Sequence, residues 1–218
     1  MKVRIAFATY LILALFPLVS YGQVWNLAND FSATQNPNGA WSLGWRPSPA
    51  KPLGLLAVDP IRCGAPHELE NWDHYIQDYT PRVTRNPQNY TVYCDYAIFS
   101  PHKVNFHPGP SQQSVVRFTA PSDMTAMLIV HFQAVDTGSS LVHIYQNDVS
   151  LFSAALEGLG QAADYSAALT CRQGDLIDCA IDPISFYGDS VQIDVLVSSI
   201  GTTATTETTW GRMRTLFR

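Results

Sequence analysis

Ser111–Phe152 reads SQQSVVRFTAPSDMTAMLIVHFQAVDTGSSLVHIYQNDVSLF and decides the fold class. Apolar residues alternate with other residues in four short runs of this stretch, which is the period of half-buried strands. Ala120-Pro121-Ser122-Asp123 and Asp136-Thr137-Gly138-Ser139 separate the runs with residues typical of turns. Because connections this short leave no room for crossover helices, the strands are predicted to be antiparallel.

The same period continues downstream, and Ser190–Ile200 is expected to form the last strand. Asp164–Cys171 and Leu176–Ile181 are expected to pair as a hairpin through the turn Arg172-Gln173-Gly174. The whole chain predicts roughly nine to eleven strands and at most one short helix, at His67–Tyr79. This pattern favours an all-β, antiparallel two-sheet sandwich of jelly-roll type.

The N-terminal segment 1–22 has the features of a secretory signal peptide. Lys2 and Arg4 precede an apolar run, and small residues follow it just before Gln23. A membrane anchor is the alternative, but the run is short for a span of about 20 residues. The mature chain is therefore expected to be extracellular or at the cell surface, without a membrane span. It divides into a single sandwich domain (23–200), an aromatic and cysteine-containing insert within it (54–101), and a Thr-rich C-terminal arm (201–218).

The low charge of the chain limits its partners. Charged residues make up 14% of the sequence, with a formal net charge of −5 and no cluster of Lys and Arg. Nucleic acid is therefore not an expected partner, since it requires a basic track along its phosphates.

Four cysteines in an exported chain indicate disulfides. In the predicted hairpin, Cys179 lies near Ala167, about 13 Å along the strand from Cys171. That separation is too large for a bridge between Cys171 and Cys179. A Cys63–Cys94 bridge fits, and so do bridges that join these two cysteines to the hairpin.

Five aromatic residues of the insert are candidates for stacking on sugar rings, because an aromatic ring offers a large apolar face. Asp73 and Asp78 are close to them in the sequence and are expected to accept hydrogen bonds from sugar hydroxyls. The alternative is that these rings pack the insert onto the sandwich. The candidates are Trp72, Tyr75, Tyr79, Tyr90 and Tyr93.

No pattern indicates catalysis, a metal or a cofactor. The acidic run that begins at His67 and includes His74 lacks the ligand spacing of a zinc or calcium site. His131 and His143 show no carboxylate partner in the sequence pattern, and no Gly-x-Ser-x-Gly motif marks a nucleophile. The chain is therefore expected not to be an enzyme.

Two further features concern the surface and the chain ends. Asn89-Tyr90-Thr91 is an N-glycosylation sequon, which makes Asn89 a candidate modification site in a host that glycosylates exported proteins. Both ends of the mature chain contain apolar residues and are expected to act as assembly arms. These residues are Trp25, Leu27 and Phe31 at one end and Trp210, Leu216 and Phe217 at the other.

Several phrases of the sequence share their order and spacing with one family of exported bacterial domains. They are Asp30-Phe31-Ser32, 36–44, His107-Pro108-Gly109-Pro110, 115–121, Val135-Asp136-Thr137-Gly138, 142–148 and Gln173-Gly174-Asp175. Together, across most of 30–197, they resemble the jelly-roll domain often found ahead of a PEP-CTERM cell-surface sorting signal. The resemblance implies an extracellular or cell-surface sandwich and supplies no catalytic residues. Since the sequence lacks the Pro-Glu-Pro motif and the apolar C-terminal helix, release or polymerisation is expected rather than anchoring.

Two hypotheses of different classes follow. The first is a structural subunit of an extracellular assembly, in which a terminal arm adds a strand to the sheet of another copy. The alternative is a carbohydrate-binding module that uses the aromatic residues of the insert on a polysaccharide.

Overall fold

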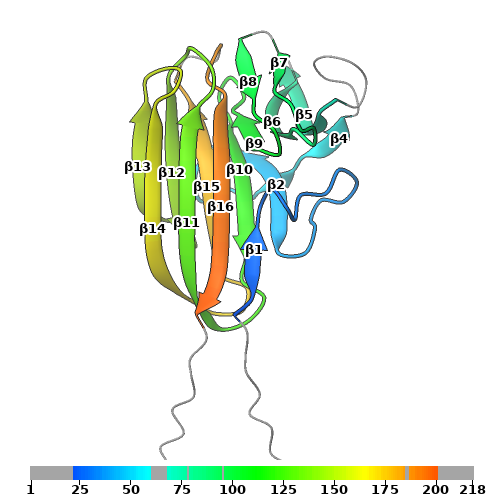
Figure 1. The fold of residues 1–218 in the computed structure, drawn as a ribbon. Coiled ribbons are helices and arrows are strands. Elements are labelled where there is room, and N and C mark those ends of the chain that lie inside the picture. Colours follow the sequence, from blue (N-terminus) through cyan, green and yellow to red (C-terminus); the bar gives the residue numbers. More distant parts are fainter. Residues whose placement is uncertain (1–21, 60–67, 78, 95, 185–186, 201–218) are drawn as a thin grey trace, which may run out of the picture. The chain divides into compact units, whose positions relative to one another are not determined.

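The computed structural model describes residues 22–59, 68–77, 79–94, 96–184 and 187–200, except for the side chains of Tyr75 and Gln77. Within these ranges the chain forms two antiparallel sheets that pack face to face, and a separate two-stranded hairpin (Figure 1). The predicted all-β, antiparallel two-sheet sandwich is confirmed. No helix occurs in the described ranges. The same residues therefore contain no apolar helix of a length that crosses a bilayer.

The larger sheet has eight strands and the smaller sheet six. Neighbouring strands of the larger sheet follow in the order β14 (Ala162–Cys171), β11 (Met124–Ala134), β16 (Val191–Ile200), β9 (Val104–His107), β6 (Thr80–Arg85), β5 (Glu70–Gln77) and β4 (Ala57–Asp59). In addition, β1 (Val24–Asn26) pairs with β16. The smaller has the order β13 (Val149–Leu156), β12 (Ser140–Gln146), β15 (Leu176–Pro183), β10 (Gln113–Thr119), β2 (Trp41–Arg46), β3 (Gly54–Leu55). β7 (Val92–Cys94) and β8 (Ala97–Phe99) pair only with each other in the described chain. The sixteen described strands exceed the nine to eleven predicted, and several of them are short strands within the insert 54–101.

The alternating residues of the deciding stretch form the core between the sheets. Val116 and Phe118 of β10 are each 1% exposed, and Leu128, Val130 and Phe132 of β11 are at most 1% exposed. Burial of a large apolar side chain contributes about 1.5–3 kcal/mol, so these positions hold the two sheets together. The alternation predicted from the sequence is confirmed at these positions, while Val115, on the opposite face of β10, is buried in a second cluster.

The predicted hairpin of Asp164–Cys171 and Leu176–Ile181 is wrong. These segments are β14 and β15, which lie in different sheets. The connection between them crosses the sandwich, and Gly174, at a φ of +86°, donates its N–H to Ala120 O at 2.9 Å. Alternation shows which residues of a strand are buried. It does not show whether two such strands pair within one sheet or face each other across the core, so it could not distinguish these two arrangements.

This topology also decides which of the predicted disulfides can form. Cys171 and Cys179 are free thiols buried in the core, so neither belongs to a disulfide. Bridges from the insert to β14 or β15 are therefore wrong. Cys94 is disulfide-bonded. The Cys63–Cys94 pairing stays a prediction, since Cys63 lies outside the described residues.

The helix predicted at His67–Tyr79 is also wrong within the described part of that segment. Glu70–Gln77 is strand β5, paired with β4 and β6. Its Trp72 is buried against the inter-sheet core and donates its Nε1–H to Ser32 O at 2.8 Å. Tertiary burial of this ring decides the conformation against the local pattern.

The segment 24–31 does not form a free arm. Trp25 of β1 is the register partner of Val197 in β16. Leu27 is 1% exposed and donates its N–H to Val195 O, while Phe31 packs against the same core. The free arm expected at this end is therefore wrong, and the assembly role of Trp25, Leu27 and Phe31 stays a prediction. Trp210, Leu216 and Phe217 lie outside the described residues, as do 1–21, so the C-terminal arm and the signal peptide stay predictions.

Candidate functional site

The β7–β8 hairpin is fastened to the rest of the domain by hydrogen bonds. Asn86 Nδ2–H donates to Phe99 O at 2.8 Å, and Asn105 Nδ2–H donates to Ile98 O at 3.0 Å. The backbone N–H of Ile98 donates to Val135 O at 3.0 Å. The hairpin buries a small apolar cluster of its own, formed by Leu69, Val92, Cys94, Ala97 and Phe99. Tyr90–Phe99, which contains this hairpin, is thus a platform held to the sandwich, and it is called the tyrosine platform below.

Tyrosines project from this platform into solvent. Val92 and Cys94 are buried while Tyr93 between them is 70% exposed, so Tyr93 lies on the outer face. Tyr96, in the turn, is 80% exposed and Tyr90, just before β7, is 50% exposed. Exposed aromatic rings held on a rigid backbone are suited to contact a ring-shaped ligand without loss of much conformational freedom.

Polar groups border these tyrosines. A hydrogen bond to the Glu68 carboxylate raises the pKa of Tyr90. Tyr79 is 40% exposed and has a positive φ of 59°. The predicted candidates Tyr79, Tyr90 and Tyr93 are thus on the surface.

Trp72 does not belong to this surface, because it is only 5% exposed and packs in the inter-sheet core. Its prediction as a stacking residue is wrong, and the packing alternative holds for it. Asp73 is 7% exposed, so it is not an open acceptor for sugar hydroxyls either. The side chain of Tyr75 and the whole of Asp78 lie outside the described part of the chain. Sequence reasoning missed Tyr96; its place in the turn of a tyrosine-rich hairpin was the available signal.

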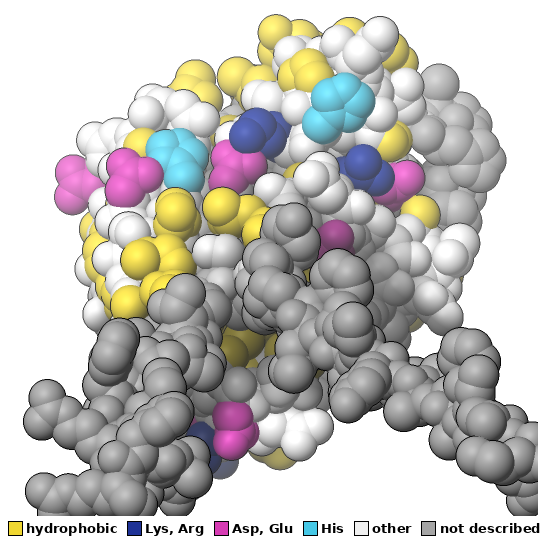
Figure 2. All heavy atoms as spheres, turned by 60° about the horizontal axis from the view of Figure 1, so that its bottom comes forward, with side chains coloured by type: hydrophobic (Ala, Val, Ile, Leu, Met, Phe, Trp, Pro, Cys, Tyr) yellow, Lys and Arg dark blue, Asp and Glu magenta, His cyan; other side chains and the backbone are white. Residues whose placement is uncertain are grey.

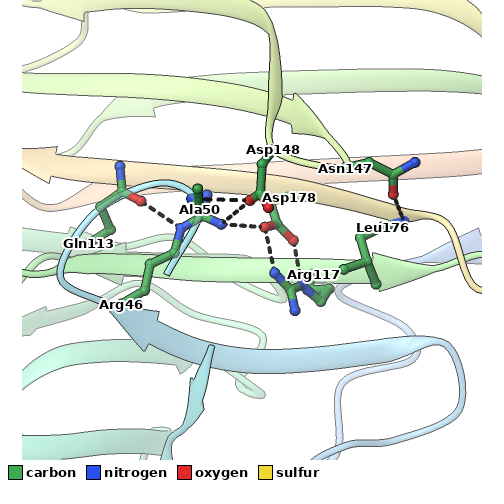
Figure 3. Close-up of polar contacts among 8 residues, drawn as sticks. All are labelled: Arg46, Ala50, Gln113, Arg117, Asn147, Asp148, Leu176 and Asp178. Carbon is green, nitrogen blue, oxygen red and sulfur yellow. Dashed lines mark hydrogen bonds and ion pairs between the residues drawn. The ribbon is translucent and has the colours of Figure 1, made fainter. Parts of the chain in front are cut away.

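A buried polar network lies on the outer face of the six-stranded sheet (Figure 3). Arg46, at 0% exposure, donates from Nε to Gln113 Oε1 at 2.8 Å. Its Nη1 donates to Asp178 Oδ2 at 2.9 Å and to Asp148 Oδ1 at 3.1 Å. Arg117 donates two hydrogen bonds to the Asp178 carboxylate, at 2.7 and 2.8 Å. The network joins β2, β10, β15 and the turn after β12.

His143 also lies on the outer face of this sheet. Its Nδ1 is 2.7 Å from Ser153 Oγ and its Nε2 is 2.9 Å from Asp182 Oδ2. Desolvation opposes ionisation of Asp182, but its contact with His143 and the influence of Gln113 and Arg46 lower its pKa overall. Ser153 is exposed on edge strand β13, so the three groups tie β12, β13 and β15 together on an open surface.

The prediction that the two histidines lack carboxylate partners is wrong. His143 contacts Asp182, and His131 Nδ1 lies 2.7 Å from Asp164 Oδ1 across β11 and β14. Figure 2 shows histidine, acidic and basic side chains interspersed on the described part of one face. Partly exposed pairs such as Lys103–Asp194, at 2.8 Å, contribute at most about 1 kcal/mol each.

A third histidine–carboxyl pair is buried inside the domain. His107 Nε2 lies 3.0 Å from Asp189 Oδ1, and His107 Nδ1 lies 2.7 Å from Pro108 O. Burial raises the pKa of Asp189 to about 8, and the neighbouring Asp136 adds to this effect. Burial and the charge of Arg82 lower the pKa of His107 to about 3. Both groups are therefore neutral near pH 7.

Within the described ranges, no group of three or more His, Cys, Asp or Glu side chains is placed to hold a metal ion. Glu70 pairs with Arg85 at 3.0 Å, and His74 stacks on Trp45 with ring centroids 4.2 Å apart. Asn89 is exposed beside Tyr90, and its modification stays a prediction.

No family model matches the chain, and no curated protein matches it. Among solved structures, its fold is similar to "Carbohydrate-Binding Module CBM36 in complex with calcium and xylotriose", with 16% identity, a TM-score of 0.32, and coverage of 46% of this chain and 82% of that one. It is also similar to a CBM51 from Clostridium perfringens GH95 in complex with methyl-galactose, with 8% identity, a TM-score of 0.37, and coverage of 58% and 91%. A CBM29-2 mutant shows 14% identity, a TM-score of 0.32, and coverage of 68% and 94%. These likenesses concern the fold, and no residue or ligand is carried over from them.

Proposed function

We propose that the chain is an extracellular, non-catalytic protein that binds polysaccharide through the tyrosines of the β7–β8 hairpin. The observation that carries this proposal is the exposure of Tyr90, Tyr93 and Tyr96, at 50%, 70% and 80%, on a hairpin that is hydrogen-bonded to the sandwich. If these rings only packed the insert, as Trp72 does, they would be buried. A tyrosine ring offers an apolar face to the C–H groups of a sugar and a hydroxyl to its polar edge.

Substitution of Tyr93 by alanine is expected to reduce retention on insoluble polysaccharides by about tenfold, and the Tyr93→Ala/Tyr96→Ala double variant to abolish it. Loss of one aromatic contact removes on the order of 1.5 kcal/mol, which corresponds to about tenfold in affinity. Pull-down with cellulose, xylan, mannan and chitin, followed by affinity electrophoresis, measures the effect.

Tyr93→Phe is the matched control, since it keeps the ring and removes only the hydroxyl, and it should retain binding. Val149→Ala, at a residue 65% exposed on β13, controls for loss of an exposed apolar side chain. Equal retention of Tyr93→Ala and the parent chain, or no retention of the parent on any of the four polysaccharides, would contradict the proposal.

A second candidate function is a structural subunit that joins copies of the chain edge to edge. Its specific observation is β14, a ten-residue strand that pairs only with β11 among the described strands and contains neither proline nor lysine. Natural sheets usually protect such an edge, because its unpaired N–H and C=O groups accept another strand. The strand donor would be the Thr-rich arm 201–218.

Deletion of 201–218 from the mature chain is expected to abolish high-mass species in this second candidate. Light scattering behind size exclusion, with negative-stain electron microscopy, measures the change. Ser166→Lys in β14 should have the same effect, since an exposed lysine disfavours edge pairing. A parent chain that remains a monomer at every concentration would eliminate this candidate.

A further inference from the structure

A pocket lies between β1 and the turn that leads into β2. It has a volume of about 260 Å³ and is lined mainly by Trp25, Asp30, Asn38, Gly39 and Trp41. This volume is near the lower end of the range for small-molecule sites, so it suits a single ring-sized group and not a polymer chain. It shares no lining residue with the tyrosine platform of the β7–β8 hairpin.

The aromatic walls of this pocket are fixed by the core. The Trp25 ring packs edge-on against Phe118, with centroids 5.2 Å apart and an interplanar angle of 65°. Trp41 packs on the same ring at 5.3 Å and 65°. The indole of Trp25 is half-buried, so a ligand would contact a surface that is already ordered.

The polar wall is held just as firmly. Asp30 Oδ2 accepts hydrogen bonds from Asn26 N–H at 2.9 Å and from Trp41 Nε1–H at 3.1 Å. Asn38 Nδ2–H donates to Asp30 O at 2.8 Å. Within the described chain, Asp30 Oδ1 has no hydrogen-bond partner, which leaves one oriented acceptor beside the indole rings.

The polar and aromatic residues of the lining indicate which class of ligand fits the pocket. A carboxylate oxygen only accepts hydrogen bonds, and the described lining contains no Lys, Arg or His, so an anion is disfavoured. The group that fits has hydroxyl donors on one edge and an apolar C–H face for an indole. We propose that this pocket binds a single sugar residue, such as the end of a glycan chain. It would be a second carbohydrate site, and it shares with the proposed function only the class of ligand.

The substitution Asp30→Asn tests the pocket with little change in shape. Because Asn26 and Trp41 both donate to the position of Oδ2, the amide oxygen must take that position. The amide nitrogen then replaces Oδ1 and turns the free acceptor into a donor. Loss of one hydrogen bond to a charged group is expected to weaken sugar binding by at least about tenfold.

The experiment is titration of the mature chain with glucose, galactose, mannose, xylose and N-acetylglucosamine, each followed by tryptophan fluorescence and calorimetry. At least one sugar is expected to give a saturable signal with a dissociation constant on the order of 1 mM. Asp30→Asn should weaken it, whereas Asp164→Asn, which removes an exposed carboxylate on β14, should not. Circular dichroism confirms that each variant is folded.

Three outcomes would contradict the proposal that this pocket binds a sugar. They are no saturable signal with any of the five sugars, equal affinity in Asp30→Asn, and loss of the signal in Tyr93→Ala. The last would show that the monosaccharide occupies the tyrosine platform. A signal that survives Tyr93→Ala while polysaccharide retention fails in the parent chain would support the pocket and refute the proposed function.

Discussion

Substitution of Arg46 by methionine is expected to lower the free energy of unfolding by about 3–5 kcal/mol, the usual cost of removing one partner from a buried ion pair. The guanidinium is fully buried and donates to Gln113, Asp148 and Asp178. Methionine keeps most of the length and apolar volume of the side chain. The variant leaves the Asp178 carboxylate, 2% exposed, with Arg117 as its one remaining cation in this network.

Urea denaturation measures this cost, with an unchanged slope showing that the change is one of stability alone. Lys103→Met is the matched control, because it removes a cation from the half-buried Lys103–Asp194 pair, which is far more open to solvent than Arg46, and should cost at most about 1 kcal/mol. The double variant Arg46→Met/Asp178→Asn should be less destabilised than the sum of its parts. Equal effects of Arg46→Met and Lys103→Met would show that the network does not hold the sheet together.

Substitution of Asp189 by asparagine is expected to remove a loss of stability that the parent chain shows between about pH 6.5 and pH 8. In the folded protein His107 Nδ1–H donates to Pro108 O, so Nε2 is left as an acceptor for the protonated Asp189 carboxyl. An asparagine amide supplies an N–H to the same Nε2 at every pH. The variant thus mimics the protonated state of Asp189.

The direction in which stability changes with pH follows from the number of protons that Asp189 and His107 bind in the folded and in the unfolded state. The pKa of Asp189 rises from 3.8 to about 8 on folding, so between these values only the folded state keeps the proton, and stability falls as pH rises. The pKa of His107 falls from 6.5 to about 3, so between these values only the unfolded state binds the proton, and stability rises with pH. The two slopes cancel between about pH 3.8 and 6.5. The net loss above pH 6.5 is on the order of 2 kcal/mol.

Urea unfolding at pH 5, 6.5, 8 and 9 tests this pH dependence. The difference in unfolding free energy between the parent and Asp189→Asn should grow from pH 5 to pH 8 and then stay constant, because Asp189 alone accounts for it. Below pH 6.5 the parent stays level while the variant, which keeps only the His107 slope, gains stability. Glu157→Gln, at an exposed residue, should run parallel to the parent. Parallel profiles for the parent and Asp189→Asn would mean that Asp189 ionises normally inside the fold.

Period-two alternation predicted the strands whose faces differ clearly in polarity. β11 buries every second residue from Ala126 on, whereas β10 and β16 begin with four and three consecutive buried residues and alternate only after them. All three strands were predicted from alternation. It did not predict which strands pair. The turn after Cys171 reads as a hairpin turn, yet it joins two sheets, because local sequence sets the direction of the chain and not its lateral neighbour.

The candidate site was predictable only where exposure follows from local pattern. Tyr93 lies between the buried residues Val92 and Cys94, which places it on the surface, but the sequence predicted it only as one of five aromatic candidates with packing as the alternative. Trp72 was misplaced because its burial depends on Ser32 and the opposite sheet. The Arg46 network could not be predicted, since its partners are 67, 102 and 132 residues away in the sequence.

The position of β16 has a consequence for the order of folding. This last described strand is central in its sheet, where β11 flanks one side and β9 and β1 share the other. Val24 thus meets Ser198, a contact between opposite ends of the domain. During synthesis, β1, β9 and β11 therefore cannot complete the larger sheet before Val191–Ile200 has left the ribosome. Such distant contacts imply slow folding, on the order of milliseconds to seconds.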